Sequence, residues 1–242
     1  HHLYGFHDVN KNFSTGDWLK LVIKKINEVR KRKKIPIIVG GTGLYFKALT
    51  DGLVNIPNIP SRFRNQIRSL HLKVGNKKFY QELLKIDPTS RNKINPTDSQ
   101  RLIRAFEVKK FTKKSIHEWF KNTKSKFENG NFFKIYIDYD RKELIERINL
   151  RTHDMIQTGA INEVNKFIKL KINKDKTATK AIGVNEIKAY LSKEKNLDEI
   201  KEKISIKTRQ YAKRQNTWAR GQMVSWQKIE PQYLNLTLKS FK

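Results

Sequence analysis

Two arginines three positions apart, Arg101 and Arg104, form the clearest chemistry-bearing pair in the sequence. They follow Gln100 in the run QRLIRAFEV, and a helix beginning at Thr97-Asp98 would place both arginines on one face. A guanidinium group presents a planar fork of donors that fits phosphate oxygens and base edges. The pair therefore suits nucleic-acid binding, although an ordinary solvated helix face explains the same spacing.

A second basic stretch, residues 208–220, interleaves cations with aromatic rings. Lys213 and Arg214 lie between Tyr211 and Trp218, a pattern that suits phosphate contacts and base stacking. The same pattern fits an amphipathic helix that packs Tyr211 and Trp218 into a core and leaves its basic face in solvent. We predict one long helix over residues 197–220, and both interpretations of its aromatic residues stay open.

The charge of the whole chain favours a polyanionic partner. Its 242 residues carry a formal net charge of +29, which attracts nucleic acid and speeds the encounter. A compositional bias toward lysine would raise the charge in the same way without a selected function. The sequence contains no cysteine, which excludes a disulfide framework and a thiolate metal site. No apolar run approaches the ~20 residues that cross a bilayer, so we expect no membrane association and a cytoplasmic protein.

These side chains need a scaffold, and a glycine-rich stretch in the first quarter of the chain predicts one. Residues 35–39 form an unbroken apolar run, which is typical of a strand buried on both faces of a parallel sheet. Gly40 and Gly41 allow a turn, and Thr42 can cap the helix that follows. Two further strand candidates occur at residues 132–138 and 224–229. We predict an α/β fold with its ligand site at the carboxyl ends of the strands, where Thr42 would stand.

The chain changes character after Asp51-Gly52. Pro57 and Pro60 mark a boundary, and the residues that follow form short amphipathic patterns with no apolar run of the strand type. We therefore predict a helical insertion at residues 60–121. The α/β core would then consist of residues 1–59 and 122–242.

Taken together, the motifs resemble those of the tRNA dimethylallyltransferases, which are also called tRNA isopentenyltransferases or IPP transferases. The matching pieces occur in the family's order and at its spacing across nearly the whole chain. Their joint order is far more specific than any one of them. The pieces are His1-His2-Leu3, PIIVGGTGLYFKAL at residues 36–49, NPTDSQRLIRAFEV at residues 95–108, Ala181-Ile182-Gly183, and TRQYAKRQ at residues 208–215 with Thr217-Trp218.

The resemblance implies a P-loop-type parallel-sheet core with an inserted helical domain that grips the tRNA anticodon stem-loop. It implies transfer of a dimethylallyl group from dimethylallyl diphosphate, with Mg²⁺, to N6 of the adenosine 3′-adjacent to the anticodon, giving N6-isopentenyladenosine. Extrusion of that base would let the enzyme reach an otherwise stacked atom. We expect a monomer in which Lys180 helps to hold the diphosphate. The residues that would bind tRNA are Thr42, Arg64, Gln100, Arg101, Leu102, Ile103, Arg104, Lys213 and Arg214.

The chain departs from the family pattern at several positions. Lys180 replaces the arginine that precedes the Ile-Gly pair, and it lacks the bidentate fork of an arginine. Val184-Asn185-Glu186 stand where the family usually has Tyr-Arg-Gln, and the glycine expected near Lys113 is missing. The family's glycine-rich phosphate loop and its general-base aspartate do not occur in these 242 residues. We therefore expect an N-terminally truncated member that has no catalytic residue of its own and no activity as written.

A non-catalytic basic RNA-binding module is the main alternative, because it explains the charge without a phosphate loop. A nucleotide-kinase fragment would share the α/β core, but the Gln-Arg-x-x-Arg helix and the arginine-containing C-terminal helix argue against it. The DNA upstream of the first codon separates the enzyme from the module, since only the enzyme requires a phosphate loop in frame there.

Overall fold

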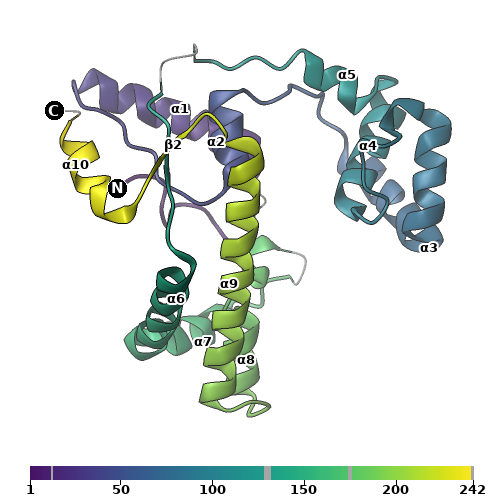
Figure 1. Ribbon diagram of the computed structural model, residues 1–242. Helices are drawn as coiled ribbons and strands as arrows, with labels where there is room; N and C mark the ends of the chain where they lie inside the picture. Colours follow the sequence, from purple (N-terminus) through teal and green to yellow (C-terminus); the bar gives the residue numbers. More distant parts are fainter. Residues whose placement is uncertain (12, 128–131, 174–175, 241–242) are drawn as a thin grey trace. The chain divides into compact units, whose positions relative to one another are not determined.

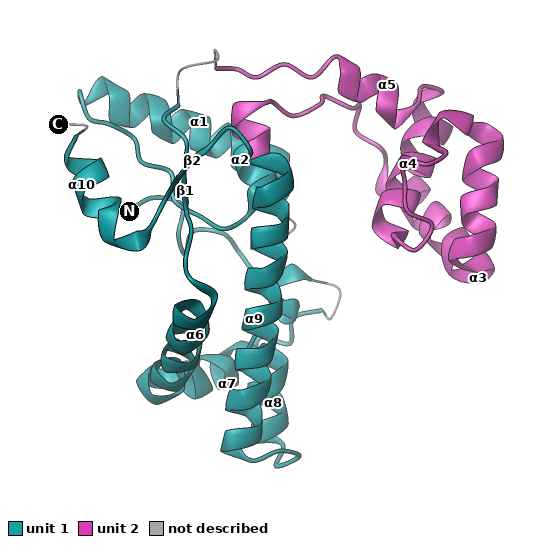
Figure 2. Ribbon diagram, in the orientation of Figure 1, with its two compact units in different colours: residues 1–46, 130–242 teal, residues 47–129 magenta. Residues whose placement is uncertain are grey.

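The structure is a computed structural model of the 242-residue chain, and it describes residues 1–11, 13–127, 132–173 and 176–240. The chain divides into two compact units, one formed by residues 1–46 and 130–242 and the other by residues 47–129 (Figure 2). Helices dominate both units, and none of the described helices is long and apolar enough to span a membrane. The helices of the first unit are α1 (Thr15–Lys31), α6 (Arg141–Met155), α7 (Ile161–Lys169), α8 (Val184–Leu191), α9 (Leu197–Gln222) and α10 (Leu234–Lys239), and α2 (Gly43–Thr50) belongs to both units (Figure 1).

Helix α1 begins at a capping box. The Ser14 hydroxyl accepts a hydrogen bond from Asp17 N at 3.1 Å, and the Asp17 carboxylate accepts one from Ser14 N at 3.1 Å. Two backbone amides that a helix start leaves unpaired are thereby satisfied. Val22 and Ile26, about one turn apart, are buried on one face of the helix. Local sequence chemistry is therefore sufficient to place this helix.

The sheet of the first unit is a parallel pair, β1 (Ile135–Ile137) and β2 (Gln227–Ile229). Beyond the ladder, Asp138 N donates to the carbonyl of Ile229 at 2.9 Å. Both strands predicted in the C-terminal half are confirmed, although each is shorter than its apolar run. Because the strands are parallel, their carboxyl ends meet at one edge of the sheet, where Asp138 and Glu230 follow them.

The strand predicted at residues 35–39 is wrong for this structure. The segment has no regular secondary structure, and Ile35, Ile37 and Val39 are 63%, 67% and 77% exposed. A strand needs a neighbour to pair its backbone amides and carbonyls. Within the described ranges the sheet contains only β1 and β2, so residues 35–39 have no strand beside them. The α/β class is confirmed, with a small parallel sheet in a mainly helical chain.

Helices α6 to α9 pack on one another around a small apolar core (Figure 1). Gly159, at φ 116°, permits the π-helical turn between α6 and α7. Helix α9 starts at Asn196, whose side chain accepts a hydrogen bond from Glu199 N at 2.9 Å. The long helix predicted from the basic stretch is therefore confirmed. The buried residues of this core are Ile156, Val164, Ile187, Ile200 and Ile204.

Helices make up most of the described residues of the second unit, where the sequence predicts a helical insertion at residues 60–121. Helix α3 (Ser61–Ile86) is kinked at Gly75, which has φ 72°, and packs against α4 (Ser99–Thr112), which α5 (Ile116–Lys121) follows. The unit spans residues 47–129; the domain boundaries at residues 59/60 and 121/122 stay a prediction. The buried residues of its core are Ile59, Ile67, Phe79, Leu83, Ile94, Leu102, Ala105, Phe106, Val108 and Ile116.

A buried carboxylate ties the helix ends of the second unit together. Asp87, at the end of α3, accepts hydrogen bonds from the hydroxyls of Thr89 at 2.5 Å, Ser90 at 3.0 Å and Ser115 at 2.8 Å. Burial raises the pKa of Asp87, but these three hydrogen bonds outweigh burial and hold the pKa below its ordinary value. Asp87 therefore stays ionised and joins the C-terminus of α3 to Ser115, the N-cap of α5.

Candidate functional site

The glycine turn at residues 40–43 lies directly against α9. Gln215 Nε2 donates to Gly41 O at 3.1 Å, and a Cβ on Gly43 would overlap the indole ring of Trp218. Glycine at Gly43 therefore lets the helix approach the backbone closely. Thr42, between the two glycines, is exposed. The fold thus brings two motifs that are distant in the sequence together and leaves Thr42 accessible at their junction.

Aromatic pairs hold this junction in place. The rings of Trp18 on α1 and Tyr45 on α2 stack with their centroids 4.3 Å apart. Phe46 meets Trp226, which lies just before β2, edge to face at 5.3 Å. Such pairs add about 0.5–1.5 kcal/mol each beyond the area that they bury. The start of α2 is therefore fixed both to α1 and to the segment that leads into the sheet.

The two aromatic residues of α9 behave differently. Trp218 packs over Gly43, whereas Tyr211 is 41% exposed and carries the Arg214 guanidinium 5.7 Å from its ring centroid. The core-packing interpretation is therefore confirmed for Trp218, whereas base stacking by Tyr211 stays a prediction that its exposure allows. Lys213 projects in another direction, because successive helix residues are ~100° apart.

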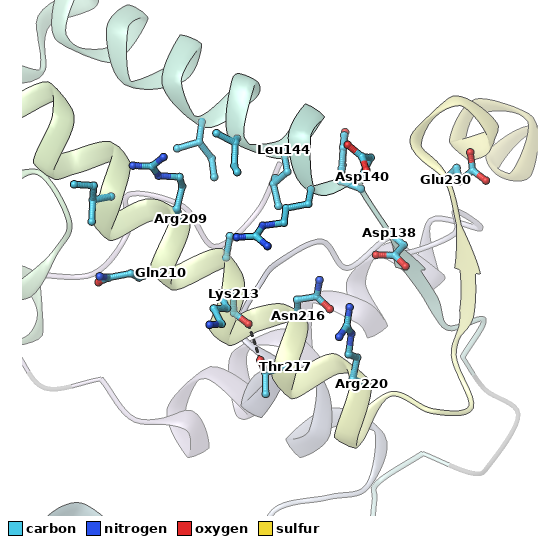
Figure 3. Close-up of a pocket in the computed structure, with 16 residues that line it drawn as sticks. Asp138, Asp140, Leu144, Arg209, Gln210, Lys213, Asn216, Thr217, Arg220 and Glu230 are labelled. Carbon is cyan, nitrogen blue, oxygen red and sulfur yellow. Dashed lines mark hydrogen bonds between the residues drawn. The ribbon is translucent and has the colours of Figure 1, made fainter.

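An open pocket of about 850 Å³ lies at the carboxyl ends of β1 and β2, with α6 and α9 as its walls (Figure 3). Asp138 and Glu230 line it directly after the two strands. Asp140 caps α6 by accepting hydrogen bonds from Lys142 N at 2.7 Å and Glu143 N at 3.1 Å. These hydrogen bonds from backbone amides lower the pKa of Asp140, with the largest effect from Glu143 N, and keep the carboxylate ionised. The pocket occupies the edge at which open α/β sheets bind their ligands.

The α9 wall of this pocket is cationic. Arg209, Lys213 and Arg220 line it at spacings that return to one side of a helix, and Figure 3 shows them along α9 beside Asn216. Arg141 of α6 also lines the pocket. These cations share the pocket with the carboxylates at the strand ends. The arrangement suits a ligand that carries both phosphate oxygens and hydrogen-bond donors.

In the second unit the two arginines of the predicted pair differ in their surroundings. The Arg101 side chain is 75% exposed, and its Nε lies 3.4 Å from Asp98 Oδ2. Arg104 is about half buried, with Nη1 3.6 Å from Glu107 Oε2. Gln100 is exposed on the first turn of α4. All three polar side chains predicted on this helix remain available to a ligand.

Leu102 and Ile103 differ from the other predicted tRNA-binding residues. Leu102 is fully buried in the core between α3 and α4, and Ile103 packs against the same core. The side chain of Leu102 is therefore not available to a ligand, and Ile103 is only partly accessible. Both lie on the apolar side of an amphipathic helix, which must face inward. Their observed role is to hold α4 in place beneath its arginines.

Arg64 and Arg104 meet at a carboxylate that sequence reasoning missed. Glu107 is 1% exposed, and its oxygens lie 3.6 Å from Arg64 Nε and 4.0 Å from Arg68 Nε. The spacing of Arg64 and Arg68 indicates a shared helix face, but only the packing of α3 on α4 brings that face to Glu107. In the same way, the four-residue spacing of Arg209 and Lys213 was a usable signal for the cationic wall of α9.

Lys180 lies apart from the pocket. It is exposed at the end of a 3₁₀ turn, Thr177–Lys180, and is not among the pocket-lining residues of the described chain. Gly183, at φ 102°, then leads into α8, where buried Glu186 accepts a hydrogen bond from Gly183 N at 2.9 Å and pairs with Lys207. Glu186, which departs from the family pattern, therefore caps the N-terminus of α8.

Fold and site together define a basic α/β protein that has a polar pocket at its sheet edge and an arginine-bearing helical unit. The chain belongs to the IPP transferase family, whose sequence model matches residues 1–222. A tRNA dimethylallyltransferase from Pelagibacter ubique (strain HTCC1062) is 55% identical over 242 residues, which cover all of this chain and 77% of that protein.

Solved structures agree with this assignment. The full-length tRNA isopentenylpyrophosphate transferase from Bacillus halodurans has a TM-score of 0.62 and 30% identity, over 95% of this chain and 71% of that chain. A eukaryotic dimethylallyltransferase acting on tRNA has a TM-score of 0.80 over 97% of this chain and 62% of that chain. At 23% identity, the second likeness supports the fold alone.

Proposed function

We propose that this protein transfers a dimethylallyl group from dimethylallyl diphosphate to N6 of the adenosine 3′-adjacent to the anticodon in tRNA. The observation that carries the proposal is the 55% identity with a tRNA dimethylallyltransferase, which extends over all 242 residues. The ordered motifs lie in the same stretch. The formal net charge of +29 and the basic surfaces of both units are what a tRNA substrate would require.

The proposed RNA contacts come from both units. In the first unit, exposed Thr42 and the Tyr211–Arg214 pair would contact bases, and Lys213 would contact a phosphate from the cationic wall of α9. In the second unit, the contacts would come from α3 and α4. We assign tRNA binding there to Arg64, Gln100, Arg101 and Arg104, with Leu102 and Ile103 beneath them.

The reaction forms a bond between N6 and the allylic carbon, breaks the bond from that carbon to the diphosphate, and releases the N6 proton. The chain's contribution is to hold the RNA so that the amine and the allylic carbon lie in line. The departing diphosphate needs positive charge, and Lys180 is our proposed contributor. We assign no residue of this chain as the base that takes the N6 proton.

The residues that the structure describes do not supply a set of protein ligands for a metal ion. No group of three or more His, Asp or Glu side chains that could hold one lies among the described residues. Mg²⁺ therefore enters the proposal only as the counter-ion expected with a diphosphate, and no step is routed through it. We further propose that the protein acts as a monomer in the cytoplasm.

The experiment is transfer of label from dimethylallyl diphosphate, labelled in its dimethylallyl group, to tRNA by the product of the intact gene. We expect label in the nucleoside N6-isopentenyladenosine after nuclease digestion. A matched tRNA transcript with guanosine at the target position should accept none. Tight tRNA binding without any label would instead identify a non-catalytic RNA-binding module.

A further inference from the structure

Three arginines of the second unit converge on one buried carboxylate. Glu107 on α4 is 1% exposed, and its Oε2 lies 3.6 Å from both Arg64 Nε and Arg104 Nη1. Glu107 Oε1 lies 4.0 Å from Arg68 Nε. Arg64 and Arg68 are one turn apart on α3, and Arg104 is one turn before Glu107 on α4. The packing of α3 on α4 therefore gathers four charges at one point.

The charges in this cluster do not balance. Within the part of the chain that the structure describes, Glu107 is the only acidic partner of these three arginines. One carboxylate against three guanidinium groups leaves a surplus of two positive charges. Burial lowers the pKa of Arg104, and the charge of Arg64 lowers it further against the opposing effect of Glu107. A second anion would relieve this repulsion.

The cluster is also poorly closed as an ion-pair network. Its three contacts measure 3.6–4.0 Å, whereas a charge-assisted hydrogen bond closes to about 2.7–2.9 Å. Glu107 Oε1 and Arg64 Nε are buried without a hydrogen-bond partner. The arginine side chains remain 42%, 53% and 41% exposed at Arg64, Arg68 and Arg104. Guanidinium donors of the three arginines are therefore exposed to solvent, while Glu107 holds the arginines together from the buried side. An ion-pair cluster with a purely structural role would not need these exposed donors.

We propose that Arg64, Arg68 and Arg104 form one clamp for a phosphate of the RNA backbone, and that Glu107 is the buried positioning residue that gathers them. Guanidinium forks match phosphate oxygens in bidentate geometry. The anchor reduces the side-chain freedom that binding would otherwise have to remove. This inference rests on the proposed function and adds Arg68 and Glu107 to the residues that serve tRNA binding.

The first test compares Arg68→Ala with Arg62→Ala, a matched control on the exposed first turn of α3 with no ion pair to Glu107. The probe is a synthetic anticodon stem-loop RNA, titrated at several salt concentrations. Arg68→Ala should weaken binding about 5- to 10-fold and reduce the salt slope by about 0.7–0.9, which is one phosphate's worth of counterion release. Arg62→Ala should change the slope by much less.

Each outcome of this comparison decides something. Equal affinity and equal salt slope for the two variants would overturn the clamp and leave the proposed function intact. A wild-type protein that does not bind the stem-loop would overturn the proposed function and the clamp together.

The second test separates positioning from simple attraction. Glu107→Gln keeps the shape of the side chain but adds one net positive charge, which by itself would tighten RNA binding. In the product of the intact gene, which the transfer assay uses, we expect the reverse: a several-fold rise in the KM for tRNA with kcat unchanged. Glu107→Asp, which keeps the charge, should lie closer to the wild type, and unfolding midpoints measured alongside report any structural damage. Wild-type or lower KM in Glu107→Gln would overturn the positioning role.

Discussion

The close approach of α9 to the glycine turn can be tested by adding a single methyl group. In Gly43→Ala the new Cβ would lie well under 3.0 Å from three atoms of the Trp218 indole ring. Ordinary van der Waals contact begins near 3.4 Å, so either the ring or the helix that carries it must move. Gly40→Ala is a matched control, because its Cβ would meet only Phe46, at 3.8 Å.

Two opposing effects set the magnitude. Gly43 is the first residue of α2, and alanine in place of a helical glycine is worth about 0.5–1 kcal/mol in favour of folding. Overpacking of a core typically costs about 1–3 kcal/mol. If the clash dominates, Gly43→Ala destabilises the protein by about 1–2 kcal/mol, which lowers the thermal midpoint by about 2–8 °C in a chain of this size. Without the clash, the substitution would stabilise the protein, so the sign of the change is decisive.

The assay is thermal unfolding of Gly43→Ala, Gly40→Ala and Gly43→Ala in a Trp218→Leu background. The double-mutant cycle isolates the contact, because removal of the ring should make Gly43→Ala neutral or stabilising. The junction also carries Thr42, so Gly43→Ala should weaken stem-loop binding. An increase in stability for Gly43→Ala alone, or an equal destabilisation in the Trp218→Leu background, would refute the argument.

Three further outcomes follow from the second unit. The pKa of Asp87 is lowered in the folded protein. The ionised carboxylate therefore stabilises the fold above its unfolded pKa of about 3.9, and this stabilisation is lost as the pH falls through its folded pKa. Asp87→Asn should remove that part of the acid transition in urea unfolding curves. Lys113 is the C-cap of α4 and has a left-handed backbone, at φ 61°. A residue with a side chain costs about 1–2 kcal/mol in that conformation, whereas glycine costs about 0.5–1 kcal/mol in lost backbone freedom. Lys113→Gly should therefore stabilise the protein by about 0.5–1 kcal/mol in urea unfolding curves. Replacement of both Arg101 and Arg104 by Ala should flatten the salt dependence of stem-loop binding by about 0.7–0.9 for each phosphate that the two arginines neutralise, with the circular dichroism spectrum unchanged.

Much of the local structure could be predicted from sequence because its determinants are local. Caps and periodicity predict the Ser14–Asp17 capping box, the positions of β1 and β2, and α9 from its first residue to within two residues of its end. Residues 35–39 show the limit of this reasoning. An apolar run indicates a strand that is buried, but burial depends on neighbours that the run itself does not encode, and in the structure these side chains are exposed.

The site could be predicted only in part for a related reason. The spacing of Arg101 and Arg104 correctly places both side chains at the surface of α4. That Arg64 and Arg68 reach Glu107 depends on how α3 packs against α4, which no spacing within either helix reveals. From the sequence alone, Glu107 resembles an ordinary surface charge, because glutamate is rarely buried. Only the packing of α3 on α4 shows that it is buried.

The most direct test of the central claim is nucleoside mass spectrometry of tRNA from a bacterium that lacks its own dimethylallyltransferase and expresses the intact gene of this protein. We expect N6-isopentenyladenosine to appear at the position 3′-adjacent to the anticodon, and to be absent with the empty vector. Expression of folded protein with that adenosine still unmodified would contradict the account.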